Sequence, residues 1–375
     1  MRLFTTLLLC CLAASTVFAQ QNEFAIIAYY AGDHKAIDDY PVEKLTHIIY
    51  SFCHLKGNQL AVDNQADSLT IRHLVSLKAR NPRLKVYLSL GGWGGCKPCS
   101  EVFSTKKGRR AFSKSVKALL KAYQADGLDL DWEYPAIEGH PGHPWKPADR
   151  PNFTSLVKRL RKDLGWGYEL SFAAGGFTKF LEASIEWDKV MPLLDYVNVM
   201  SYDLVHGYST VTGHHTPLYS TKEQLESTDH AVRFLDSIGV PMKKVIIGAA
   251  FYGRVWEQVA NVNNGLYQTG KFKRGVPYRA MQQYVQETPG FQQFWDEVAN
   301  APFMYNAEKQ LFLTYDNPLS VSLKTKYARQ NGLGGIMFWQ LAEDLPSEAK
   351  HEGSMPEEKP EGLLDAIYKS AQQSN

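Results

Sequence analysis

Four acidic side chains lie within eight residues, in the segment Asp126-Gly127-Leu128-Asp129-Leu130-Asp131-Trp132-Glu133. Because the side chains of a β-strand alternate between its two faces, Asp129, Asp131 and Glu133 are expected on one face. Three carboxyl groups on a packed strand must share protons and hydrogen bonds, which separates their pKa values. The pattern therefore predicts acid–base chemistry, with Glu133 outermost and one carboxylic acid protonated beside an ionised partner.

Two other interpretations of this segment stay open. A solvated strand face could carry three acids, but Leu128, Leu130 and Trp132 indicate that the strand is packed, with Trp132 facing outward. The D-x-D-x-E spacing could also bind Mg²⁺ or Ca²⁺. That site would need ligands from elsewhere, and the sequence has no G-x-x-x-x-G-K-[ST] phosphate loop. Acid–base chemistry without a metal or cofactor is favoured over both, and Asp126 is expected to brace the start of the strand.

The N-terminus and the overall composition predict an exported protein. Residues 1–19 combine Arg2, the apolar run Leu3–Ala13 and the small-residue site Val17–Ala19, the pattern of a secretory signal peptide. Residues 20–375 would form the secreted catalytic domain. The net charge of +2 gives no electrostatic case for nucleic acid or membrane partners, and a monomer is expected. Much of the aromatic content of 8 Trp, 20 Tyr and 18 Phe must lie in the core, and an excess of exposed Trp and Tyr would suit stacking against sugars.

The remaining cysteines and the paired histidines are expected to be structural or superficial. Cys53, Cys96 and Cys99 remain after residue 19, and export permits a disulfide. Cys96 and Cys99 have the spacing of a redox or zinc motif but lack a second such pair, so a small staple or three free thiols are favoured. The pairs His214-His215 and His140-x-x-His143 are interpreted as surface histidines.

Short apolar runs alternate with helical segments along the chain. The predicted strands are Ala25–Tyr30, Thr46–Phe52, Lys85–Leu90, Gly127–Glu133, Tyr168–Ala174, Tyr196–Met200, Val245–Phe251 and Gly335–Trp339. The predicted helices are Ser68–Arg80, Lys107–Gln124, Asn152–Leu164, Lys222–Ser237 and Leu319–Gln330. This α/β alternation predicts a (β/α)8 TIM barrel, whose active site lies at the carboxyl ends of the strands. Residues 254–317 break the rhythm between strands 7 and 8 and are predicted to form a small α+β insertion with a hairpin over 304–312.

Five motifs at predicted strand ends resemble those of the family 18 glycoside hydrolases, the chitinase family. They are Asp126-x-x-Asp129-x-Asp131-x-Glu133, Ser89-Leu90-Gly91-Gly92-Trp93, Met200-x-Tyr202-Asp203, Tyr252-Gly253-Arg254 and Gly334-Gly335-Ile336-Met337-Phe338-Trp339. The resemblance covers nearly the whole chain after residue 19. It implies retaining, substrate-assisted hydrolysis of β-1,4-linked N-acetylglucosamine in chitin or its oligosaccharides.

The resemblance also implies roles for individual residues. Glu133 would be the general acid and base, Asp131 would orient the acetamido group, Asp129 would hold Asp131, and Tyr202 would bond the acetamido oxygen. The residues expected to bind substrate are Trp93, Trp339, Met200, Asp203, Tyr252, Arg254, Tyr30 and Phe52. Trp339 would pack beneath the sugar at the cleavage site, and Trp93 would stack on a sugar further along the substrate chain. Asp203 would bond either the substrate or the surroundings of Tyr202.

Two other functions share this fold and these motifs. A chitin-binding lectin would bind without hydrolysis, but such proteins usually lose the acid, and Glu133, Asp131 and Tyr202 are all present here. An endo-β-N-acetylglucosaminidase acting on N-glycans would share the mechanism. The predicted insertion and Trp93 favour a linear polymer over an N-glycan.

Overall fold

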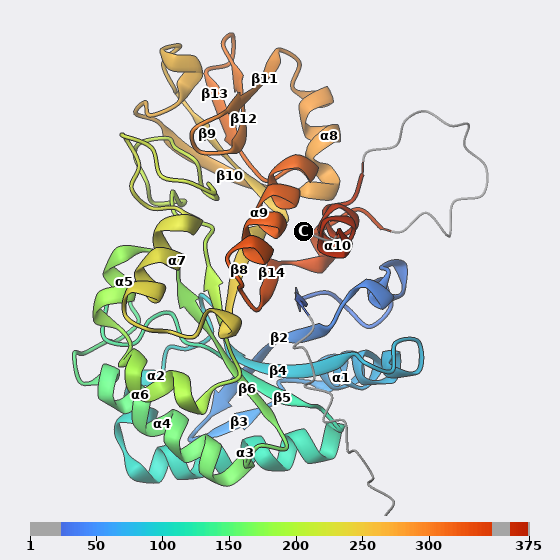
Figure 1. Ribbon diagram of the computed structural model, residues 1–375, viewed down its shortest axis with the longest axis vertical. Coiled ribbons are helices and arrows are strands. Elements are labelled where there is room, and N and C mark those ends of the chain that lie inside the picture. Colours follow the sequence, from blue (N-terminus) through green and yellow to red (C-terminus); the bar gives the residue numbers. More distant parts are fainter. Residues whose placement is uncertain (1–23, 347–360, 374–375) are drawn as a thin grey trace, which may run out of the picture.

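The computed structural model describes residues 24–346 and 361–373, and its main body is a closed parallel barrel (Figure 1). The strands are β1 (Ala25–Tyr30), β2 (His47–Lys56), β4 (Lys85–Gly91), β5 (Gly127–Asp131), β6 (Glu169–Gly175), β7 (Tyr196–Met200), β8 (Val245–Ala250) and β14 (Gly335–Trp339). They pair in the order β1-β14-β8-β7-β6-β5-β4-β2, and β1 pairs with β2 to close the ring. The predicted (β/α)8 barrel is confirmed. The predicted signal peptide lies outside the described residues.

Helices cover the outside of the barrel. They are α1 (Gln65–Ser76), α2 (Cys99–Ser104), α3 (Lys106–Tyr123), α4 (Asp149–Leu164), α5 (Thr178–Ala183), α6 (Trp187–Val190), α7 (Thr228–Ser237), α9 (Pro318–Gln330) and α10 (Leu363–Gln372). Short 3-10 helices span Ala36–Asp39, Val42–Lys44, Leu77–Ala79, Met191–Leu193, Met242–Lys244, Asn263–Gly265 and Leu341–Glu343. Alternate residues of each strand divide between two cores. Ile27 and Tyr29 of β1 join the cluster inside the barrel, whereas Ile26 and Ala28 pack toward the helices.

Among the boundaries that differ from the sequence prediction are those of α7 (Thr228–Ser237), β2 and β5. The helix predicted to begin at Lys222 begins at Thr228, because the Ser227 side chain caps it by accepting a hydrogen bond from the His230 amide. Strand β2 runs past Phe52 and pairs antiparallel with a short extra strand, β3 (Gln59–Ala61). The β5 ladder ends at Asp131, so Glu133 stands beyond the strand rather than on it.

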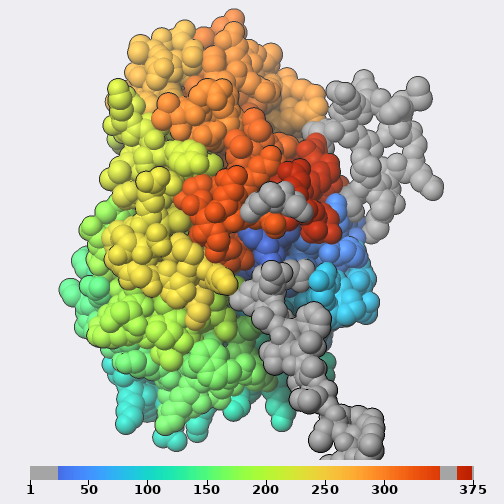
Figure 2. All heavy atoms as spheres, viewed as in Figure 1, coloured from blue at the N-terminus to red at the C-terminus, as the bar shows by residue number. Residues whose placement is uncertain are grey.

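A second, antiparallel sheet follows β8 in the chain. It contains β9 (Tyr252–Glu257), β10 (Lys271–Pro277), β11 (Phe291–Asp296), β12 (Ala301–Asn306) and β13 (Leu311–Thr314), in the order β10-β9-β13-β12-β11, and is accompanied by α8 (Tyr278–Glu287). The hairpin predicted over 304–312 is confirmed by the pairing of β12 with β13. These residues form the yellow-to-orange upper end of the molecule, above the barrel in the view shown (Figures 1 and 2).

A fully buried ion pair joins this segment to the barrel. The Lys324 ammonium on α9 donates to both carboxylate oxygens of Asp316, at 2.9 and 2.7 Å, and to the Thr216 hydroxyl. Asp316 also accepts the backbone amide of Ala250 at the end of β8, at 3.0 Å. Because both charges are buried, removing either would leave the other without its counter-charge.

Candidate active site

Asp129 lies at the centre of a hydrogen-bond network inside the barrel. It is fully buried and accepts hydrogen bonds from Tyr29 Oη (3.1 Å), Ser89 Oγ (2.8 Å), Ser171 Oγ (2.6 Å) and Asn198 Nδ2 (3.2 Å). Burial raises the pKa of Asp129, and these four donors lower it. The donors come from β1, β4, β6 and β7, so the closed ring of strands is what surrounds this carboxyl group with partners.

Asp131 continues the same inward face toward the strand end. Leu128, Leu130 and Trp132 take the opposite face and pack in the outer core, so the predicted alternation along β5 is confirmed. Asp131 is only 4% exposed, and its Oδ1 atom has no hydrogen-bond partner among the described residues. Burial and then the charges of Glu133 and Asp129 raise the pKa of Asp131 well above its ordinary value.

Glu133 occupies a partly buried position just past the end of β5. Burial raises its pKa to about 7, the charge of Asp203 adds to the increase, and a hydrogen bond from Tyr134 opposes it. A carboxyl group with this pKa is substantially protonated near neutral pH, as a general acid requires.

Asp126 stands outside this set, at the other end of the strand. Its Oδ2 accepts the Val86 amide at 2.7 Å and lies 2.6 Å from the Lys78 ammonium. The prediction that Asp126 braces the start of the strand is confirmed.

Tyr202 projects into the inner cluster from the segment after β7. Its phenol oxygen lies 3.8 Å from the Met337 sulfur, and Met200 borders the same cluster. Burial and then the charges of Asp131 and Glu133 hold the pKa of Tyr202 well above its ordinary value. The phenol therefore stays protonated and can donate a hydrogen bond to an acceptor placed among these acids.

Asp203 is ion-paired with Arg254. It forms a two-pronged ion pair with the Arg254 guanidinium and lies 3.5 Å from His215 Nδ1. Although burial opposes it, the nearby His215 ring and the hydrogen bonds from Arg254 hold the pKa of Asp203 well below its ordinary range. The Tyr252 ring completes the group, with its centroid 5.3 Å from that of His215 and 6.4 Å from that of Tyr202.

The interpretation of His214 and His215 as surface histidines is wrong. Both are buried, at 1% and 0% exposure. His214 Nε2 lies 3.0 Å from Asp296 Oδ2 and so ties the long loop after β7 to β11. No sequence pattern distinguishes these histidines, because the second sheet that covers them begins more than thirty residues away along the chain.

Trp339 and Phe52 form an aromatic floor at the mouth of the barrel. Their rings stack with centroids 5.5 Å apart and planes 13° apart, and Trp339 lies 6.0 Å from Tyr29. The expectation that Tyr30 lines this groove is wrong, because Tyr30 is fully buried in the outer core. Tyr29 occupies the inward position instead. The run Ala25–Tyr30 is apolar throughout, so it carries no alternation that could assign its faces.

Trp93 heads a second aromatic group on the loop after β4. Its ring is 40% exposed and lies 6.4 Å from Tyr134, 5.4 Å from His140 and 6.3 Å from Tyr208, between centroids. Tyr208 is itself 63% exposed. Neither Tyr134 nor Tyr208 was expected here from the sequence, and His140 was expected, with His143, only as a surface histidine. Exposed aromatic faces beside buried acids are typical of carbohydrate sites.

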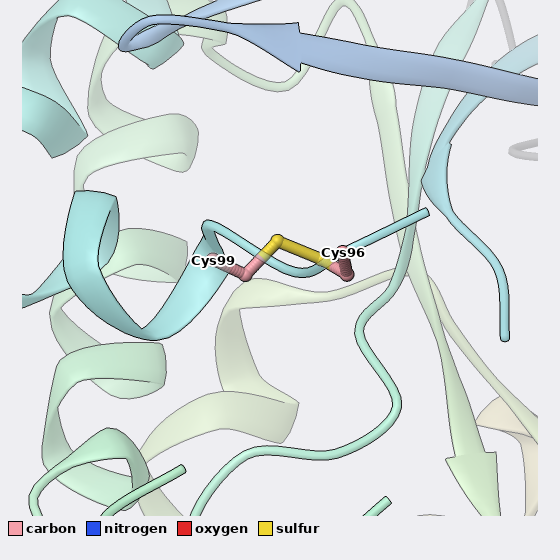
Figure 3. The surroundings of a disulfide bond; sticks show 2 residues. All are labelled: Cys96 and Cys99. Carbon is pink, nitrogen blue, oxygen red and sulfur yellow. A yellow bond between two sulfur atoms is a disulfide. The ribbon is translucent and has the colours of Figure 1, made fainter. Parts of the chain in front are cut away.

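The three cysteines after residue 19 form one disulfide and leave one free thiol. Cys96 and Cys99 form a disulfide across the short turn before α2 (Figure 3), and Cys53 is a buried free thiol. Within residues 24–346 and 361–373, no three His, Cys, Asp or Glu side chains are grouped as metal ligands. In the same residues, no helix has the length and apolar character to cross a bilayer.

Comparison with known proteins agrees with this geometry. Residues 25–344 match the sequence profile of glycosyl hydrolases family 18. The chain is 34% identical over 300 residues to chitinase A1 of Niallia circulans, covering 73% of this chain but only 42% of that protein. It is 30% identical over 331 residues to chitotriosidase-1 of Mus musculus, covering 83% and 70%. The solved structure of a family 18 N-acetylglucosaminidase from Paenibacillus barengoltzii superimposes with a TM-score of 0.80 at 33% identity, covering 93% of this chain and all of that one. The chain therefore belongs to glycoside hydrolase family 18.

Proposed function

We propose that this protein is a secreted enzyme that hydrolyses β-1,4 linkages between N-acetylglucosamine units in chitin or its oligosaccharides and retains the anomeric configuration. The observation that carries the proposal is the pairing of Asp131 and Glu133. Asp131 offers a buried carboxyl oxygen that has no hydrogen-bond partner within residues 24–346 and 361–373, and Glu133 beside it has a pKa of about 7. These are an acceptor for an amide N–H and an acid for a leaving oxygen.

The first step breaks the glycosidic bond. Glu133 transfers its proton to the glycosidic oxygen, and the acetamido oxygen of the same sugar attacks the anomeric carbon. The bond to the departing sugar breaks, which leaves an oxazolinium ion. Asp131 accepts the acetamido N–H and faces the new positive charge, while the Tyr202 phenol donates to the acetamido oxygen. Substrate participation replaces the enzymic nucleophile of most retaining glycosidases.

The second step opens the oxazolinium ion with water. Glu133, now a carboxylate, removes a proton from a water molecule that attacks the anomeric carbon, and the bond from that carbon to the acetamido oxygen breaks. Two displacements at one carbon give net retention. Asp129 keeps Asp131 in place as part of the same inward row, and its four donors stabilise its own charge.

Substrate binding is assigned to the aromatic floor and its rim. Trp339, supported by Phe52, would hold the sugar at the cleavage site in a distorted ring form. Trp93 would stack on a sugar further along the polymer. Met200 and Tyr252 would border the acetamido group. The pairing of Arg254 with Asp203 would fix one wall of the site.

The test uses N-acetylchitohexaose and reads both products and stereochemistry. Proton NMR should show the β-anomer of the new reducing end first. The Glu133→Gln variant should turn over roughly 10²–10⁴-fold more slowly than the wild type, or slower still. Glu138→Gln, which changes an exposed carboxyl group five residues away, should keep full activity. Initial formation of the α-anomer, or near-normal turnover by Glu133→Gln, would contradict the mechanism.

A second candidate activity is release of single N-acetylglucosamine units. The N-acetylglucosaminidase from Paenibacillus barengoltzii favours it, because this chain matches that protein over its whole solved length. Mass spectrometry of the same digest separates the activities, since monomer alone indicates the second and dimers or longer products the first. Binding without products would indicate a lectin. Cleavage of N-glycans but not of the hexamer would indicate an endo-β-N-acetylglucosaminidase.

A further inference from the structure

The loop that carries Trp93 is unusually rich in glycine. Two glycines stand on each side of Trp93 in the sequence Gly91-Gly92-Trp93-Gly94-Gly95. Glycine has the largest conformational freedom of any residue, so such a loop alone would not hold a side chain in place. The exposed Trp93 ring nevertheless packs beside the ring of Tyr134, the residue that follows Glu133. Something outside the loop sequence must fix it.

The first half of the loop is fixed against the site itself. The Gly92 amide donates to the Asp131 carbonyl oxygen at 3.0 Å. A Cβ atom on Gly91 would lie 2.1 Å from the same oxygen, and one on Gly92 would lie 2.3 Å from the Phe52 ring. Both glycines also have positive φ angles, of 114° and 79°. The chain therefore passes directly over the backbone of Asp131 and the aromatic floor.

The second half of the loop is fixed by the disulfide. The Gly95 amide donates to the Gly92 carbonyl oxygen at 2.9 Å and closes a turn around Trp93. The next residue, Cys96, is bonded to Cys99 at the start of α2 (Figure 3). Both cysteines are buried in the outer core, at 3% and 0% exposure. The Cys99 amide also donates to the Cys96 carbonyl oxygen at 3.0 Å.

We propose that the Cys96–Cys99 disulfide is a positioning element for Trp93. It anchors the C-terminal end of the glycine loop to α2. The indole is therefore already in position beside Asp131 and Glu133 before a sugar binds. Disulfides stabilise whole folds least when they close short loops, so a bond between residues three apart acts mainly on its own turn. Ordering the loop before binding removes an entropy cost that the substrate would otherwise meet. The inference rests on the proposed function, because it takes Trp93 to contact sugar.

The test is a double-mutant cycle on substrate binding. In a Glu133→Gln background, whose turnover is expected to be greatly slowed, calorimetry measures Kd for N-acetylchitohexaose. Cys96→Ser/Cys99→Ser and Trp93→Ala should each weaken binding about 3- to 10-fold, the loss typical of one aromatic contact. The triple variant should bind no more weakly than Trp93→Ala alone, because both changes remove the same contact. Cys53→Ala, which removes the buried thiol outside the bond, should bind as the parent does.

The outcomes separate positioning from a merely structural staple. With Glu133 intact, loss of the disulfide should raise KM and leave kcat within about twofold. Unchanged Kd without the disulfide, or losses that add in the triple variant, would overturn the proposal. If the serine pair does not fold, Cys96→Ala/Cys99→Ala repeats the test without burying hydroxyl groups, and failure of both to fold would show a global role instead. A Glu133→Gln parent that does not bind the hexamer would instead refute the proposed function.

Discussion

Replacing Glu133 by glutamine should stabilise the protein in alkaline solution. The pKa of this carboxyl group rises from 4.5 to about 7 on folding, chiefly through burial. Between these values the folded state holds a proton that the unfolded state has lost, so the free energy of unfolding falls as pH rises from about 4.5 to 7. Glutamine has no proton to lose and avoids this cost. The variant should therefore gain stability at pH 8 and almost none at pH 4.

The size of the effect follows from the pKa difference. A difference of 2.5 units corresponds to roughly 3 kcal/mol at 1.36 kcal/mol per unit. Since the Glu133 side chain is partly exposed and water screens its charge, about 1–3 kcal/mol is expected. About 350 residues at about 2.1 cal/mol/K each give an unfolding entropy near 0.7 kcal/mol/K. The melting temperature at pH 8 should therefore rise by about 1–4 °C.

Scanning calorimetry of the wild type, Glu133→Gln and Glu138→Gln at pH 4 and pH 8 measures this difference. The exposed Glu138 controls for loss of a negative charge near the strand end and should give the same shift at both pH values. Equal melting temperatures of wild type and Glu133→Gln at pH 8 would refute the reasoning. The carboxyl group would then be no more costly to ionise in the folded site than in water.

Three further predictions concern the acids, the junction and the aromatic floor. The kcat/KM of the proposed hydrolysis should fall above about pH 7 as Glu133 loses its proton. Burial also raises the pKa of Glu343 to about 7, so either carboxyl group could cause this loss of activity. The pH profile of Glu343→Gln separates the two, and it should show the same fall in kcat/KM above about pH 7 as the wild type. Lys324→Met should cost about 3–5 kcal/mol by denaturant unfolding, because it leaves a buried carboxylate unpaired, whereas Lys326→Met on the exposed face of the same helix should cost little. Trp339→Ala should lower kcat and kcat/KM together with a smaller change in KM, and a rise in KM alone would make it a general binding platform.

The sequence by itself determined the barrel and the row of acids. Alternation of short apolar runs with helical segments was sufficient for the fold, because each βα unit is encoded locally. The spacing of Asp129, Asp131 and Glu133 predicted one shared face; the structure confirms it for the first two, whereas the strand ends before Glu133. A period of two is independent of the rest of the chain, so these residues needed no knowledge of their neighbours.

Only the tertiary structure decided which partners surround those acids. Tyr29 faces inward and Tyr30 faces the helices. Because β1 is apolar on both faces, its sequence does not show which face is which, and only closure of the barrel decides it. His215 reaches Asp203 because the second sheet buries the loop after β7. The disulfide that follows Trp93 in the chain was one of several possibilities for three cysteines until the turn before α2 brought two of them together. In each case the deciding contact joins segments far apart in the chain or depends on a turn's geometry, and neither leaves a periodic signal in the sequence.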